Sequence, residues 1–222
     1  MFARVAHRYD LANHLLSFNL DRHWRSHTVR RVSAVLERPE ARVLDLCCGT
    51  GDLALALARG RRDTVFASDF CHPMLDAARH KAARRHARLE LFEADALRLP
   101  APDASFDLVT VAFGFRNLAN YAAGLAEMRR LLRPGGMAAI LEFSTPPGAV
   151  FAALYQFYSH RMLPWIGGAL TGNRDAYTYL PESVRRFPEA DHLAEDMRRA
   201  GFTEVRYEYL TGGIVALHIG SA

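Results

Sequence analysis

Long apolar runs and cysteine are both scarce in this sequence. No run of about 18 apolar residues occurs, so we expect no membrane-spanning helix. The first residues include Arg4 and Arg8 but no apolar stretch, which argues against a secretory signal. The three cysteines, Cys47, Cys48 and Cys71, form no CxxC pair. We therefore expect free thiols in a reducing cytoplasm and no metal site.

Charge of one sign is not concentrated anywhere along the chain. The 28 basic residues exceed the 24 acidic ones by 4, and the pI is about 9.2. The arginine clusters are scattered and are typical of solvated helix faces, so we expect no nucleic-acid partner. A basic face also suits transient, peripheral contact with an anionic membrane. A homodimer is a further possibility that the sequence leaves undecided. Half of the 222 residues are hydrophobic, enough for the core of one domain over 1–222.

Strand-like and helix-like stretches alternate through the middle of the chain. This alternation predicts an α/β, Rossmann-like fold with a mostly parallel, seven-stranded sheet and helices on both faces. A hairpin around Gly212-Gly213 is expected to add an antiparallel edge at the C-terminal end. The predicted strands are 42–46, 64–68, 88–93, 106–113, 137–143, 203–210 and 214–219, and the predicted core helices are 52–58, 73–85 and 121–132. Pro134-Gly135-Gly136 is predicted to end the last of these helices.

Two helical regions lie outside this alternating core. One covers about 1–38, and the other is an insertion at about 149–200. In open α/β sheets, ligands bind beyond the carboxyl ends of the strands. We therefore expect both regions to cover the substrate site.

A glycine-rich turn follows the first predicted strand and carries the strongest signal. Gly49, Gly51 and Ala54 fit a dinucleotide fingerprint, but that spacing alone is weak evidence. Asp52 and Asp45 would repel a pyrophosphate by a few kcal/mol at about 4–6 Å. S-adenosylmethionine carries a sulfonium and an ammonium and no phosphate. The acidic turn therefore favours this methyl donor.

Further acids follow the next two predicted strands. Asp69 can take both ribose hydroxyls, but it can equally cap the helix that begins near Pro73. Asp95-Ala96 can meet the adenine amine, although Asp95 can also merely order a turn. Both alternatives stay open at this stage.

The motifs extend beyond a fold class. The sequence resembles the ubiquinone/menaquinone biosynthesis C-methyltransferase family, and the similar segments run in order from end to end. They are 1–13, 44–52, 113–117, 132–136, 141–144, 163–167, 177–183 and 210–218. The resemblance implies donor contacts at Thr50, Asp69, Asp95, Ala96 and Ala112, with Asp45, Gly49 and Gly51 in the same loop.

Methylation of a ring carbon requires a quinol whose hydroxyl has lost its proton. Arg116 can stabilise that oxyanion or orient a water, and Asn117 can bind a ring oxygen. Glu142 is a candidate base. Each has a structural alternative, which for Arg116 is a salt bridge at a helix N-terminus.

Other candidates are expected to line the substrate site. Tyr9 is a candidate donor to a quinol oxygen, and the remaining candidate substrate contacts are Asp10, Asn13, Phe113, Tyr177 and Tyr179. The aromatic segment 151–165 is either core or a groove for a polyprenyl tail.

These observations predict an S-adenosylmethionine-dependent C-methyltransferase that acts on a polyprenyl quinol, with demethylmenaquinol favoured. The resemblance leaves a benzoquinol of the ubiquinone pathway as an alternative. Two other interpretations remain. The chain is either another small-molecule or RNA methyltransferase, or a non-catalytic scaffold in a quinone-synthesis complex. A cytoplasmic enzyme at the inner face of the membrane would fit this substrate.

Overall fold

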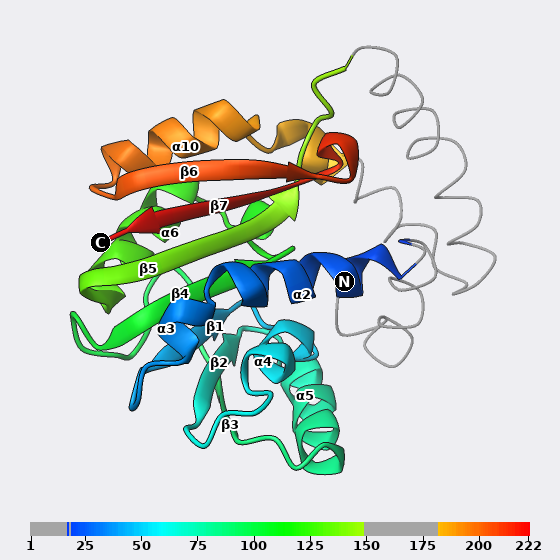
Figure 1. Cartoon of the computed structure of the whole chain (residues 1–222), viewed down its shortest axis with the longest axis vertical. Coiled ribbons are helices and arrows are strands. Elements are labelled where there is room, and N and C mark those ends of the chain that lie inside the picture. Colours follow the sequence, from blue (N-terminus) through cyan, green and yellow to red (C-terminus); the bar gives the residue numbers. More distant parts are fainter. Residues whose placement is uncertain (1–16, 18, 149–181) are drawn as a thin grey trace.

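The computed structural model describes most of the chain (Figure 1). Its described residues are 17, 19–148 and 182–222. The predictions for Tyr9, Asp10, Asn13, Tyr177 and Tyr179 lie outside them, as do those for the segment 151–165.

Seven strands form one sheet in the order β3-β2-β1-β4-β5-β7-β6. The strands are β1 (Val43–Leu46), β2 (Val65–Asp69), β3 (Leu89–Glu93), β4 (Phe106–Ala112), β5 (Leu132–Phe143), β6 (Thr203–Leu210) and β7 (Val215–Ser221). β1 to β5 run parallel, whereas β7 is antiparallel to both of its neighbours. The predicted mostly parallel sheet with a C-terminal hairpin is therefore confirmed. The reversed strand β7 lies inside the sheet, and β6 forms the edge.

Helices cover both faces of this sheet (Figure 1). They are α2 (Leu20–Arg31), α3 (Ser33–Leu36), α4 (Asp52–Leu57), α5 (His72–Arg84), α6 (Tyr121–Leu131) and α10 (Ala190–Arg199), with short 3-10 turns η2 (Phe115–Asn117) and η4 (Thr211–Gly213). The helices predicted from the sequence agree with α4, α5 and α6 to within a residue or two at each end.

The core divides into two apolar clusters, one on each face of the sheet. Successive strand residues point to opposite faces, so Val43 belongs to one cluster and Leu44 to the other. Leu108 and Val109 divide in the same way. Because both faces are buried, the central strands carry nearly continuous apolar runs instead of alternating ones.

The turn at residues 134–136 differs from the prediction. β5 already begins at Leu132, which pairs with Phe106, but the next pair joins Met137 to Leu108. The strand therefore bulges around Gly135, which has a φ of 75° and donates its N–H to the Ala222 carbonyl at 2.8 Å.

The helix α10 also differs from the expected cover over the ligand edge. It contacts β6, β7 and α6. Its buried apolar residues are Ala190, Leu193, Ala194 and Met197, and none of them is more than 2% exposed. α10 thus completes the second core cluster, and the part of the insertion at 149–181 lies outside the described residues.

Candidate active site at the carboxyl edge of the sheet

Parallel strands deliver the predicted site residues to one edge of the sheet. The chain leaves β1 through 47–51, and Asp69 ends β2. Asp95 follows β3, the segment 113–117 follows β4, and Glu142 lies near the end of β5. All five connections leave from carboxyl ends of neighbouring strands, so the structure brings these predicted residues to a common edge.

The loop after β1 is shaped by backbone that favours glycine. Cys47, Gly49 and Gly51 have φ values of 50°, 55° and 83°. A side-chain carbon added to Gly49 would meet none of the described residues within 4 Å, whereas one on Gly51 would lie 3.1 Å from the Ala78 Cβ in α5. Gly49 therefore faces open space that suits a ligand, while Gly51 allows close packing against α5.

Asp69 anchors this loop from the next strand. Its Oδ2 accepts the N–H of Gly49 at 2.8 Å, and its Oδ1 accepts that of Cys71 at 2.9 Å. Burial raises the pKa of Asp69, and the donors Cys71 and Gly49 oppose the shift. Cys71 is the N-cap residue of α5, so Asp69 supports the approach to the helix without capping it. The Phe70 backbone N–H also bonds to this carboxylate, which keeps acceptor capacity for a ribose hydroxyl.

Asp45 is fully enclosed beneath the loop. Its side chain accepts a hydrogen bond from the Thr110 hydroxyl at 2.7 Å, and the residue is 1% exposed. Burial raises the pKa of Asp45 to about 7, although Thr110 and the positive charge of Arg25 oppose the shift. The charge on this carboxyl therefore changes near neutral pH.

Lys81 changes one part of the charge argument made from the sequence. Its ammonium donates to Asp52 Oδ1 at 2.6 Å and to Thr50 Oγ1 at 2.8 Å. The charge of Asp52 is therefore balanced inside the protein and gives little reason to exclude a phosphate. The preference for a cationic ligand depends instead on Asp45 and Asp69.

Asp95 orders a turn, as its structural alternative predicted. Its Oδ1 accepts the Leu97 N–H at 2.9 Å, and the residue is exposed. The neighbouring Ala94 donates its N–H to the Asp69 carbonyl at 3.1 Å, which joins the two acidic positions. Ala96 and Ala112 are both partly exposed near this edge.

Arg116 and Glu142 form a buried ion pair at the ends of β4 and β5. Arg116 Nη1 lies 2.7 Å from Glu142 Oε1, and the two side chains are 6% and 1% exposed. Glu142 also accepts the backbone N–H groups of Arg116 and Phe143, at 3.1 and 2.8 Å. Arg116 further donates to Ser183 Oγ and to the Phe113 carbonyl. The predicted salt-bridge alternative is therefore present, with Glu142 as the partner.

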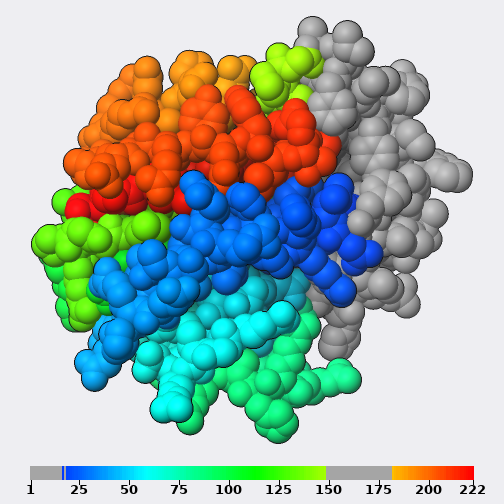
Figure 2. All heavy atoms as spheres, in the orientation of Figure 1, coloured from blue at the N-terminus to red at the C-terminus, as the bar shows by residue number. Residues whose placement is uncertain are grey.

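An aromatic cluster beside this pair was not recognised in the sequence. Trp24 of α2 lies 5.9 Å from the Phe113 ring and 6.3 Å from the Phe143 ring, centroid to centroid. The Arg25 guanidinium lies 5.5 Å from the centroid of the Phe113 ring. The Trp24 indole donates to the Thr211 hydroxyl at 2.8 Å, which fastens α2 across the sheet (Figures 1 and 2).

Two further residues of the edge escaped the sequence analysis. Phe70, directly after Asp69, is a large apolar side chain that is 70% exposed. A side-chain carbon on Gly114 would lie only 2.4 Å from the Cys47 Cβ, so the end of β4 requires glycine to pack on the loop. The one signal for Phe70 in the sequence is an aromatic residue directly after a strand-end acid, and its exposure became visible only in the structure.

The three cysteines lie in the connections that follow β1 and β2. Cys47, Cys48 and Cys71 are free, as predicted, and burial raises the pKa of Cys47 and Cys48. Among residues 17, 19–148 and 182–222, no group of three metal-ligating side chains occurs. Within the same ranges, no helix is both long and apolar enough to span a bilayer.

The strand order, the glycine loop after β1 and the acids at the carboxyl ends of β1 to β3 define the fold of S-adenosylmethionine-dependent methyltransferases. A SAM-dependent methyltransferase from Aquifex aeolicus superimposes with a TM-score of 0.62 at 19% identity, covering 86% of this chain and 88% of that one. A possible histamine N-methyltransferase from Thermotoga maritima gives 0.67 at 17%, covering 100% and 99%. The [4+2]-cyclase SpnF gives 0.68 at 17%, covering 89% and 80%, so the fold alone does not fix the reaction.

Sequence similarity then identifies the family. The model of the ubiE/COQ5 methyltransferase family matches residues 1–222, and the chain belongs to that family. Demethylmenaquinone methyltransferase of Thermus thermophilus is 50% identical over 99% of each chain. That of Deinococcus radiodurans is 49% identical over 99% of this chain and 90% of the relative. Ubiquinone/menaquinone biosynthesis C-methyltransferase UbiE of Shewanella pealeana is 40% identical over 99% and 88%.

Proposed function

We propose that this protein transfers a methyl group from S-adenosylmethionine to a ring carbon of demethylmenaquinol, a polyprenyl quinol. The two relatives at about half identity, both named demethylmenaquinone methyltransferase, support the substrate. The observation that carries the chemistry is the Arg116–Glu142 pair, which lies at the same sheet edge as the acidic loop. A cytoplasmic enzyme that touches the inner membrane face only transiently fits such a substrate.

The donor fits the loop after β1. We assign its contacts to Asp45, Gly49, Thr50, Gly51, Asp69, Asp95, Ala96 and Ala112. The open space beside Gly49 leaves room for the ligand against the backbone. The acids Asp45 and Asp69 favour a cation, and the neighbouring Phe70 offers an exposed ring for an adenine to stack on.

Bound S-adenosylmethionine supplies an electrophilic methyl group, so the chain must supply a site for the nucleophilic ring. Arg116 donates toward the quinol oxygen and stabilises its negative charge, while a water molecule oriented by the guanidinium takes the hydroxyl proton. Glu142 fixes the guanidinium by a bidentate contact to the Arg116 side chain and backbone N–H. We therefore assign Glu142 to positioning in this resting geometry, while its role as a base remains a prediction.

The remaining substrate contacts are proposed around this pair. Asn117 follows Arg116 in η2, and Phe113 packs between Trp24 and Phe143. Tyr9, Asp10, Asn13, Tyr177 and Tyr179 complete the proposed substrate site. The aromatic cluster excludes water, which strengthens the interaction between Arg116 and the developing oxyanion.

The role of Arg116 is tested with the double variant Arg116→Ala/Glu142→Gln, because removing one partner of a buried pair leaves a costly charge. We expect turnover to fall about 100-fold or more, as for the loss of an oxyanion donor, while donor affinity stays within about threefold. Glu142→Gln alone is the matched control and retains the guanidinium. Unchanged turnover in the double variant would remove Arg116 from the mechanism.

The substrate class is tested with labelled donor and a panel of demethylated quinols, with products identified by mass spectrometry. We expect methylation of the naphthoquinol in preference to the benzoquinol. The name of the Shewanella relative keeps the benzoquinol of the ubiquinone pathway as the second candidate. Methylation of RNA alone would contradict the proposal, and failure to bind the donor would support a non-catalytic scaffold.

A further inference from the structure

The connection between β3 and β4 carries Asp95 yet contains no helix or strand. Residues 94–105 lie in turns and loops. At its start, Ala94 bonds to the Asp69 carbonyl, and Asp95 accepts the Leu97 N–H. An irregular segment of this length keeps a fixed shape only if its backbone groups find partners elsewhere.

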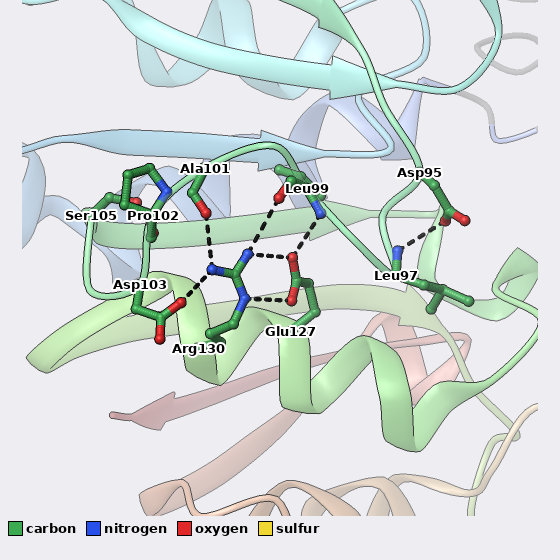
Figure 3. A network of polar contacts seen from close by, with 9 residues as sticks. All are labelled: Asp95, Leu97, Leu99, Ala101, Pro102, Asp103, Ser105, Glu127 and Arg130. Carbon is green, nitrogen blue, oxygen red and sulfur yellow. Dashed lines mark hydrogen bonds and ion pairs between the residues drawn. The ribbon is translucent and has the colours of Figure 1, made fainter.

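In the middle of the connection, those partners are one pair of side chains on α6 (Figure 3), whereas the N–H groups of Ala104 and Ser105 bind main-chain carbonyls at the end of α6. Glu127 Oε1 accepts the Leu99 N–H at 2.7 Å, and Arg130 binds both oxygens of Glu127 at 2.7 Å. Arg130 also donates to the Leu99 carbonyl at 3.3 Å, the Ala101 carbonyl at 2.9 Å and Asp103 Oδ1 at 2.6 Å. One fork-shaped contact on a rigid helix thus holds the middle of the connection.

The Glu127–Arg130 ion pair stays charged at neutral pH. Burial raises the pKa of Glu127, but the hydrogen bonds from Arg130 and Leu99 outweigh it, so the pKa lies below its usual value. Hydrogen bonds from Glu127 and Asp103 raise the pKa of Arg130. Glu127 is 8% exposed and Leu99 is 4% exposed, so water competes little for these bonds.

We propose that Glu127 and Arg130 are positioning residues for the adenine end of the methyl donor. They hold Leu99, which follows the turn that Asp95 orders, and thereby fix the position of Asp95 relative to Asp69. The inference rests on the proposed function, in which Asp95 accepts a hydrogen bond from the adenine amine. Selectivity for adenine then depends on Glu127 and Arg130 of α6, to which no contact with the donor is assigned.

The test measures affinity for S-adenosylhomocysteine and S-inosylhomocysteine, which lacks the amine, by calorimetry. The wild type is expected to prefer the adenine ligand. In Glu127→Ala, adenine affinity should fall about tenfold and the preference over the inosine ligand should shrink toward one, because Asp95 loses its fixed position. The KM for the donor should rise with little change in kcat.

Arg130→Lys provides a milder variant that retains charge but loses the fork. It should lie between the wild type and Glu127→Ala in the ratio of the two affinities, and amide exchange at Leu97 and Leu99 should accelerate in the same order. Glu195→Ala removes an exposed ion pair with Arg199 on α10, with an N–O distance of 3.1 Å, and should change neither quantity.

The outcomes separate the two proposals. A wild type that binds neither ligand sinks the proposed function. A wild type that prefers adenine, with folded variants that keep the same preference, leaves the proposed function intact and overturns the positioning role. If both ligands lost affinity equally in the variants, the Glu127–Arg130 pair would only support the fold in general. That result would also overturn the positioning role.

Discussion

At the scale of single residues, we expect Asp45 to make donor binding depend on pH. Its carboxyl is enclosed, and burial raises its pKa to about 7. An unfolded aspartate titrates near 3.9, so the folded state holds the proton more tightly. The stabilisation from this group is complete below about pH 4 and is lost as pH rises through about 7.

Donor affinity should change in the opposite direction. A cationic donor favours the ionised form of Asp45, so affinity should fall as pH decreases below about 7, by at most about tenfold per pH unit. Calorimetry in buffers of differing ionisation enthalpy would show a proton released on binding. Asp45→Asn should bind more weakly, with the slope removed; a slope that persists would assign the proton to another group.

Local sequence patterns were enough to predict candidate site residues at strand ends. Asp69 ends β2 and Asp95 follows β3, so predicting these strands also located the two acids. Lys81 could not be placed, because its partner Asp52 is 29 residues away and their approach depends on how α5 packs. Trp24 meets Thr211 across 187 residues, and no local pattern encodes that contact.

At the scale of elements, a buried histidine of β7 contacts the start of α10. His218 is 2% exposed, its Nε2 lies 2.8 Å from the Ala190 carbonyl, and its Nδ1 has no partner among the described residues. Its ring stacks on Tyr207, whose hydroxyl donates to Asp191. Burial lowers the pKa of His218 to about 4, although the Ala190 bond and the charge of Asp191 oppose the shift.

This layer should therefore weaken in acid. The unfolded histidine takes up a proton near pH 6.5 and the folded one only near 4, so its contribution is lost as pH falls between them, by about 3 kcal/mol in total. Urea unfolding at several pH values, compared between the wild type and His218→Leu, measures this directly. The variant should lose less stability in acid, whereas parallel curves would contradict the assignment.

Helices and strands were predicted correctly where the apolar pattern is strong. Features that depend on which strands pair in the sheet were not predicted. The apolar runs of β1 and β4 and the helices α5 and α6 follow from local pattern. The place of β7 between β5 and β6 does not, because a hairpin can join a sheet by either strand. The bulge around Gly135 likewise arises from pairing with β4 and the chain end.

At the scale of the whole molecule, α2 lies on the surface in the view of Figure 2, where it is coloured blue. Arg22 and Arg30 of this helix are exposed, while Trp24 is buried and packs near the site. The net charge of the chain is +4. We propose that this basic helix makes brief contact with an anionic bilayer, where a polyprenyl quinol would reside.

Vesicle sedimentation tests this orientation. The wild type should bind vesicles that contain anionic lipid and detach at high salt, because the attraction is screened. Arg22→Glu/Arg30→Glu should weaken binding about tenfold or more. Arg84→Glu/Arg85→Glu, exposed at the end of α5, alters net charge equally and should bind better than the α2 variant. Identical binding by both variants would rule out α2 as the contact.

The bond from Trp24 to Thr211 has a further consequence for biosynthesis. The ribosome makes α2 well before η4, because Thr211 lies 187 residues beyond Trp24. The indole N–H therefore lacks its acceptor until η4 has emerged, whereas Phe113 and Phe143 become available to the Trp24 ring earlier. We expect the aromatic contacts of α2 to form first and the indole hydrogen bond to fix the helix afterwards.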